Sequence, residues 1–162
     1  MHASRSDAIG AMLVADLHQQ DTWHVNWLSS AQEMASILEE VVAAMAELGY
    51  PSKDIFGARL ALEEAICNGI KHGHQHDRSK VVEVRYCSRA DHLLLEVEDQ
   101  GPGFDPSQIP DATAPENLER PSGRGLLLMR HYAAWVRYNR KGNCVTLCIC
   151  PSEPLPGFLP NV

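Results

Sequence analysis

The stretch that decides the fold is LALEEAICNGIKHG, residues 60–73. Its apolar residues recur at the spacing of an α-helix, so we predict a helix that begins near Pro51 and Ser52 and runs to about His72. Gly73 is predicted to end it. The side that faces the core is predicted to consist of Ile55, Ala58, Leu62, Ala65, Ile66 and Gly69.

A second stripe lies almost opposite the core side of this helix. It begins with the small residues Gly57 and Ala61 and continues with Glu64, Asn68 and His72. The last three are four residues apart, so their side chains follow one edge of the helix. Small residues that lead to a carboxylate and an amide indicate a surface that something approaches closely. An exposed polar face without a ligand remains the alternative.

The segments around this helix predict an α+β fold. A capping-box pattern at Ser30 and Glu33 opens an earlier helix, which Gly49 ends. Helices grouped against a largely antiparallel, mixed sheet form a two-layer sandwich with the helices on one face. The remaining elements are predicted as strands at 21–30, 80–88, 92–98, 134–140 and 143–150 and a helix at about 124–133.

A second polar cluster, Asp99-Gln-Gly101-Pro-Gly103, follows an apolar strand. A carboxylate at a strand end can accept a hydrogen bond from a ligand amino group. The glycines allow the backbone to come close, because they have no Cβ. The same residues are also common in plain turns.

A third cluster, Ser122-Gly123-Arg124-Gly125, directly precedes an apolar helical pattern. A glycine-rich turn that opens a helix presents free N–H groups and the positive end of the helix dipole, which suits phosphate. The cluster does not match the lysine-containing P-loop, and residues 101–106 do not match G-x-G-x-x-G, because position 106 is proline.

Together the three clusters resemble the N, G1 and G2 boxes of the GHKL ATPase superfamily, in particular anti-sigma factor serine kinases of the RsbW and SpoIIAB type. The matching segments are LALEEAICNGIKHG, VEDQGPGFDP (97–106) and PSGRGLLLM (121–129). The resemblance implies the Bergerat, histidine kinase-like ATPase fold over residues 21–150. An N-terminal arm or short helix at 1–20 and a proline-rich tail at 151–162 lie outside it.

The resemblance also implies roles for individual residues. Asn68 would bind Mg²⁺ through its amide oxygen, and Glu64 would be the general base. Asp99 would accept a hydrogen bond from the adenine amino group. Glu63 is rejected as the base, because five residues place it about 140° around the helix from Asn68.

The glycine-rich segments would surround the rest of the ATP molecule. Gly101 and Gly103 would pass the base and sugar, and Gly123 and Gly125 would line the phosphates. Residues 104–122 would form the ATP lid. Arg120 and Arg124 are candidates to meet the phosphate charge.

The function implied by the resemblance is an anti-sigma factor and serine/threonine kinase. It would bind a sigma factor and phosphorylate an antagonist protein of the STAS fold, and it would pair as a homodimer. A binding module that acts by docking alone remains an alternative. A histidine kinase-like ATPase domain is a further one, disfavoured because no long helical pair precedes the domain.

Composition limits the other function classes. A chain of 162 residues suits one domain, and its net charge of −7 argues against direct binding to nucleic acid or anionic lipid. No apolar run approaches the roughly 20 residues of a membrane span, and the N-terminus is only weakly like a signal peptide, so we expect a cytoplasmic protein.

Two smaller groups of residues suggest metal or redox chemistry. Five cysteines without regular spacing argue against a disulfide framework, and Cys148 and Cys150 should share one face of a strand. The segment that contains His72, His74 and His76 could hold Zn²⁺ or Ni²⁺, although such a loop offers little defined ligand geometry.

Overall fold

The computed structural model describes residues 22–75, 77–108 and 124–155. Five strands form one sheet in the order β1-β2-β3-β5-β4, and all four neighbouring pairs are antiparallel. This confirms the predicted α+β class. The strands are β1 (His24–Leu28), β2 (Val82–Ser88), β3 (Leu93–Glu98), β4 (Trp135–Tyr138) and β5 (Cys144–Ile149).

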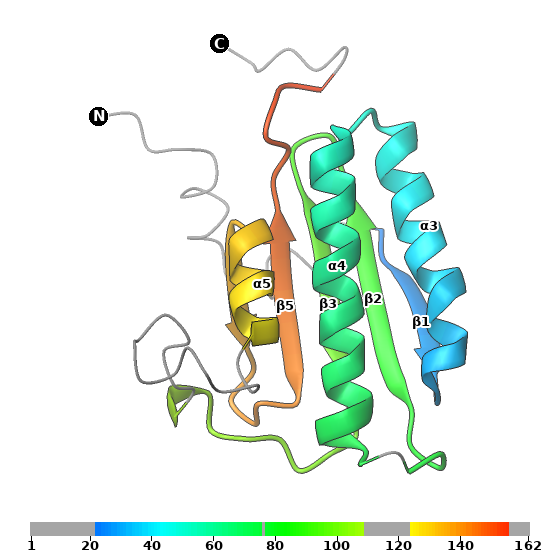
Figure 1. Cartoon of the computed structure of the whole chain (residues 1–162), viewed down its shortest axis with the longest axis vertical. Coiled ribbons are helices and arrows are strands. Elements are labelled where there is room, and N and C mark those ends of the chain that lie inside the picture. The colour runs from blue at the N-terminus through cyan, green and yellow to red at the C-terminus, as the bar shows by residue number, and fades with distance from the viewer. Residues whose placement is uncertain (1–21, 76, 109–123, 156–162) are drawn as a thin grey trace.

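Three helices cover one face of this sheet, as Figure 1 shows. They are α3 (Met34–Glu47), α4 (Ser52–Asn68) and α5 (Arg124–Tyr132). Three short turns complete the described elements: η1 (Ala31–Glu33), η2 (Gly69–Gly73) and η3 (Pro106–Gln108). The predicted two-layer arrangement with the helices on one side is therefore confirmed.

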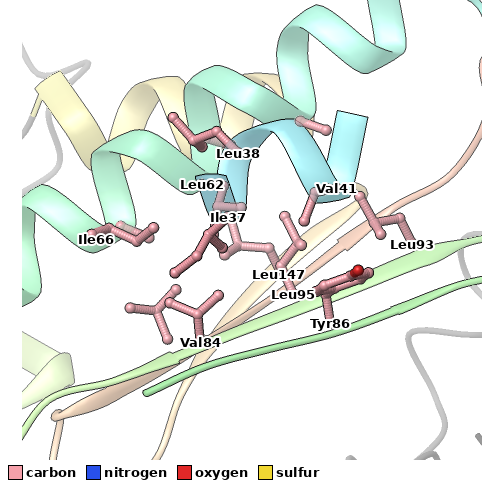
Figure 2. Close-up of a cluster of buried hydrophobic side chains, with 14 of the residues drawn as sticks. Ile37, Leu38, Val41, Leu62, Ile66, Val84, Tyr86, Leu93, Leu95 and Leu147 are labelled. Atoms are coloured by element: carbon pink, nitrogen blue, oxygen red, sulfur yellow. The ribbon is translucent and has the colours of Figure 1, made fainter. Parts of the chain in front are cut away.

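The core lies between the sheet and the helices (Figure 2). Alternate residues of each strand point toward the helices, so one face of the sheet is apolar. Burying a Leu or Ile side chain contributes about 1.5–3 kcal/mol, and this layer contains many of them. Its members include Ile37, Leu38 and Val41 of α3, Leu62 and Ile66 of α4, and Val84, Tyr86, Leu93, Leu95 and Leu147 of the strands.

The beginning of the first long helix differs in detail from the prediction. Ser30 makes no side-chain capping hydrogen bond. Instead the backbone N–H of Ser29 donates to Oε2 of Glu33 at 2.6 Å. The capping contact of Glu33 is therefore made with Ser29 and not with the predicted Ser30, because the 3₁₀ turn η1 precedes α3. At the other end Gly49 adopts a φ of 80° and ends the helix as predicted.

The end of α4 also differs from a regular helix. After Asn68 the chain continues as the π turn η2, which is closed by the N–H of His74 donating to the Gly69 carbonyl at 2.9 Å. Isolated π turns of this kind are frequent at functional sites. The predicted helix to His72 is therefore confirmed in extent, with a wider last turn.

The other face of the sheet carries a small second cluster. Leu94 and Cys148 are fully buried there. Trp23, Trp135 and Cys150 pack against them, so Cys148 and Cys150 share a face as expected. All five cysteines are free thiols.

None of the helices in the described ranges is both long and apolar enough to cross a membrane.

Candidate functional site

A cavity of about 610 Å³ opens between the end of α4 and the start of α5. The C-terminal end of β3 and the N-terminal end of β5 also border it. This volume is typical of small-molecule sites. Its lining includes Glu64, Asn68, Asp99, Gly103 and Gly125. The fold thus brings residues from all three predicted clusters to one cavity.

The polar stripe of α4 has two halves with different neighbours. A Cβ at Gly57 would overlap the ring of Tyr132, so in this half α5 makes the close approach. In the other half Glu64, Asn68 and His72 line the cavity. The polar half of the stripe thus lies at a cavity, as predicted for a surface that something approaches closely. The small residues accommodate a helix, and the polar residues after them face the cavity.

Glu64 lies against the first turn of α5. A Cβ at Gly125 would overlap its carboxylate, so this glycine permits the contact. The approach also places a negative group at a helix N-terminus, where the helix dipole favours it. The neighbouring Glu63 is not among the residues that line the cavity, which agrees with its rejection as a base.

Asn68 and Lys71 belong to the same end of the cavity. Within the described ranges, no side-chain hydrogen bond to Asn68 and no ion pair of Lys71 is formed. Lys71 was not predicted. Its position three residues after Asn68 on a helix places it near the same edge, which is the signal that could have identified it.

The residues at this end fit Mg²⁺ held mainly by phosphate. The described parts of the chain contain no group of three or more His, Cys, Asp or Glu side chains that could hold a metal. Mg²⁺ needs no such group, because it keeps several waters and commonly binds one or two protein oxygens plus substrate phosphates. The half-buried amide of Asn68 supplies one such oxygen.

Asp99 is fixed at the end of β3 by the turn between β4 and β5. Its N–H donates to the Asn143 carbonyl at 2.9 Å, and Nδ2 of Asn143 donates to the Asp99 carbonyl at 2.7 Å. The N–H of Gly101 donates to Oδ1 of Asp99 at 2.7 Å. Within the described residues, no hydrogen bond to Oδ2 is formed.

The glycines around Asp99 serve close approaches between chain segments. A Cβ at Gly73 would overlap the Asp99 carboxylate, and one at Gly101 would overlap the carbonyl of Gly73. Gly101 consequently does not line the cavity, in contrast to the expectation that it passes the ligand. Gly103 does line it, with a φ of 75° and its backbone against Lys141.

Burial controls the protonation of Asp99 and of the neighbouring His74. Burial raises the pKa of the Asp99 carboxyl above its ordinary value, and the Gly101 N–H and the charges of His74 and Lys141 oppose this only in part. Burial likewise lowers the pKa of His74, against the attraction of Asp99. The two side chains are thus close, but neither charged form is strongly stabilised.

His74 does not form the metal site that was considered. Its side chain is buried, and its Nε2 accepts a hydrogen bond from the N–H of Gln100 at 3.1 Å. Asp77 receives hydrogen bonds from Ser79 instead. His76 lies outside the described residues.

The remaining wall of the cavity is apolar and aromatic. The rings of Phe104 and Tyr138 meet edge to face, with centroids 5.1 Å apart. Such a wall suits a flat ring, while polar groups at its edge fix the ring's orientation. Sequence reasoning missed these residues, because they come from separate elements: Val97, Phe104, Leu126, Met129, Tyr138 and Val145.

Several predicted residues cannot be placed. Arg120 and Gly123 lie in 109–123, outside the described residues, as does most of the proposed lid. Arg124 begins α5, but its side chain is not described. The described first part of the lid segment contains η3, in which Asp105 accepts hydrogen bonds from Ser107.

Comparison with known proteins agrees with this geometry. The family model for the histidine kinase-like ATPase domain matches residues 28–149. An anti-sigma F factor of Clostridium perfringens is 29% identical over 111 residues, which cover 67% of this chain and 79% of that protein. A serine-protein kinase RsbW of Oceanobacillus iheyensis is 26% identical over 100 residues, which cover 58% of this chain and 63% of that protein. Another RsbW, from Bacillus licheniformis, is 32% identical over 74 residues, which cover 45% of this chain and 46% of that protein.

Proposed function

Because the chain belongs to the family of histidine kinase-like ATPase domains, we propose that it is an ATP-binding anti-sigma factor and serine/threonine protein kinase. Its substrate would be a serine on an anti-sigma antagonist protein, and it would regulate transcription through a sigma factor. The names of its relatives, anti-sigma F factor and serine-protein kinase, support this choice.

The observation that carries the proposal is the single cavity shared by the three polar clusters. One end holds Asp99 beside an apolar, aromatic wall, which suits an adenine ring and its amino group. The other end holds Glu64, Asn68 and Lys71 beside the start of α5, which suits phosphate and its counter-ion. We name these the adenine end and the phosphate end.

The proposed reaction transfers the γ-phosphoryl group of ATP to a serine hydroxyl. The serine oxygen forms a bond to the γ-phosphorus as the bond to the β–γ bridging oxygen breaks, and ADP leaves with that electron pair. Glu64 accepts the hydroxyl proton. Lys71, the N-terminus of α5 and the predicted Arg120 and Arg124 would offset the phosphate charge, and the predicted Gly123 would line the phosphates.

Asn68 would hold Mg²⁺ through its amide oxygen, with the other positions taken by phosphate and water. The ion would supply charge neutralisation on the phosphate oxygens. The protein supplies orientation, because Asn68 and Glu64 lie one helical turn apart on α4. Of the predicted glycines, Gly125 lines the phosphate end.

The partners follow from the relatives rather than from the cavity. We propose an antagonist of the STAS type, a sigma factor and a second copy of the chain as partners. We propose no direct contact with nucleic acid, in keeping with the negative net charge.

Nucleotide binding with and without Mg²⁺ tests the phosphate end. Asn68→Ala should lose most of the Mg²⁺-dependent gain in ATP affinity, measured by titration calorimetry. Asn26→Ala is the matched control, because Asn26 lies on β1 and contacts Glu40 of α3. Equal Mg²⁺ dependence in wild type and Asn68→Ala would remove Asn68 from its role.

Transfer of labelled phosphate from ATP to a STAS-type antagonist tests the kinase activity. Glu64→Gln should lower the rate by about 10²–10⁴-fold with ATP affinity retained, because it removes the base. Glu63→Gln is the control, since Glu63 does not line the cavity. ATP binding without transfer by the wild type would instead favour a module that acts by docking alone.

A further inference from the structure

His74 joins the end of α4 to the segment that carries Asp99. Its backbone N–H closes the π turn by donating to the Gly69 carbonyl, and its ring is only 1% exposed. Nε2 accepts the N–H of Gln100, the residue that follows Asp99. Among the described residues Nδ1 makes no hydrogen bond.

Gln100 extends this connection to the start of β2. Its side-chain oxygen accepts the N–H of Val81 at 2.9 Å, so both its backbone and its side chain are held. On its two sides, Asp99 is bound to Asn143 and Gly101 is bound to the Asp99 carboxylate. The His74 ring is thus one of the few groups that fix the direction of this segment.

We propose that His74 is a positioning residue that holds the adenine end in its binding geometry only while its ring is neutral, so that acidification weakens nucleotide binding. The inference rests on the proposed binding of adenine nucleotide at Asp99. It concerns a residue that touches the Asp99 segment and does not line the cavity itself.

The physical reason is the hydrogen-bonding capacity of imidazole. A neutral ring has one acceptor nitrogen, and here that nitrogen is Nε2, so the hydrogen lies on Nδ1. Protonation places a second hydrogen on Nε2, which then faces the N–H of Gln100. Two donors cannot share this contact, so the ring or the Gln100 peptide must move.

Burial and the neighbouring charges determine how readily the His74 ring is protonated. Burial disfavours the charged ring most, and Lys80 disfavours it further. Asp99, Asp77 and the backbone of Val81 favour it. A ligand bound to Asp99 needs the segment in place, so it should favour the neutral ring. By linkage, the same coupling must appear as a lower pKa of His74 in the nucleotide complex.

The first experiment measures the pKa of His74 in the wild-type protein by NMR titration, with and without saturating ADP. The spectrum of His74→Gln identifies the His74 signal among the eight histidines. The pKa should be lower in the ADP complex. An equal or higher pKa with ADP bound would overturn the inference, whatever the variant does.

The second experiment measures ADP affinity against pH for wild type and His74→Gln. The glutamine oxygen can occupy the place of Nε2 and does not titrate. One pH unit below the pKa of His74, about one molecule in eleven keeps the neutral ring, so wild-type affinity should fall about tenfold relative to His74→Gln. Dividing the two profiles removes the titration of ADP itself.

The outcomes separate this inference from the proposed function. Absence of ADP binding by the wild type at every pH would contradict the nucleotide site itself. ADP binding with parallel pH profiles for wild type and His74→Gln would contradict only the role of His74. His74→Leu, which has no acceptor, should bind ADP more weakly than His74→Gln at all pH values, and equal affinities would also count against the role.

Discussion

The two ends of the cavity differ in how much of their structure is already complete. At the adenine end Asp99 is held through Asn143 and Gly101, and His74 fixes the next residue. At the phosphate end, Asn68 and Lys71 make no side-chain hydrogen bond or ion pair within the described ranges. The fold alone fixes the side chains of the first end, whereas the proposed nucleotide and Mg²⁺ would supply the partners of the second.

This difference predicts how the two ends respond to change. A side chain fixed by several hydrogen bonds cannot move aside cheaply, so crowding it or removing one of its partners should cost both stability and affinity. A flexible side chain without partners can adjust, so a substitution near it should affect function alone. Loss of nucleotide affinity should therefore be largest for changes at Asp99 itself and smallest for changes beside Glu64.

Asp99→Asn should cause the largest loss. The change removes a charged acceptor and can turn an N–H₂ group toward the adenine amino group, so affinity for ADP should fall by about 100-fold, or ~3 kcal/mol. Titration calorimetry measures this. Asp105→Asn is the control, because Asp105 binds Ser107 outside the cavity. Unchanged ADP affinity in Asp99→Asn would show that adenine is recognised elsewhere.

The same variant has a pH-dependent effect on stability. Because the folded pKa of Asp99 lies above its ordinary 3.8, the folded state binds more protons between these two values. The contribution of Asp99 to the free energy of unfolding of the wild type therefore falls as pH rises through that interval. Asp99→Asn should raise the melting temperature at pH 7 by on the order of 1 °C, given solvent screening, and less near pH 4. The reverse trend would contradict the burial effect.

Gly73→Ala should cause the second-largest loss of ADP affinity. The new methyl group would overlap the Asp99 carboxylate, which its hydrogen bonds hold in place. Overpacking of this kind costs about 1–3 kcal/mol, and we expect ADP affinity to fall about tenfold as Asp99 is displaced. Calorimetric unfolding and ADP titration measure both effects. Loss of neither would show that the adenine end is adaptable.

Asn143→Ala should have a smaller effect on affinity. It removes the hydrogen bond to the Asp99 carbonyl and leaves that group without its partner, at a cost of about 1–2 kcal/mol in stability. Affinity should fall only a few-fold, because the N–H of Asp99 keeps its bond to the Asn143 carbonyl. A loss as large as that of Asp99→Asn would mean that the turn itself binds nucleotide.

Gly125→Ala should cause the smallest loss of ADP affinity, less than the few-fold loss expected for Asn143→Ala. Its methyl group would overlap the Glu64 side chain from Cγ to Oε1, so this side chain must turn aside. Alanine favours a helix by about 0.8–1 kcal/mol over glycine, which offsets much of that cost, so stability should change by less than ~0.5 kcal/mol. Phosphoryl transfer should nevertheless fall about tenfold, because the base is displaced. Stability losses equal to those of Gly73→Ala would erase the contrast between the two ends.

Local pattern was enough to predict α4, the sheet strands and the three polar clusters. The stripe from Glu64 to His72 is a property of helical spacing alone, and the hairpin of β2 and β3 follows from apolar runs separated by a short turn. Neither depends on distant parts of the chain. These features could therefore be predicted from the sequence alone.

The rest of the site depends on contacts between distant residues. Asn143 lies 44 residues from Asp99, and its turn reaches the Asp99 backbone only because β5 pairs with β3. Similarly, Gly101 was assigned to the ligand, but the carbonyl of Gly73 in η2 and the Asp99 carboxylate occupy its Cβ position. The π turn at Gly69 leaves no periodic signal, so the inward position of His74 was not predicted.

The contact between Gly57 and Tyr132 has a mechanical consequence. It packs the C-terminal end of α5 against α4, while nearer the other end Gly125 lies against the Glu64 side chain and Leu126 and Met129 are buried in the core. Gly57 thereby sets how closely α5 can pack on α4, because any larger residue there would push the Tyr132 ring, and with it the end of α5, away.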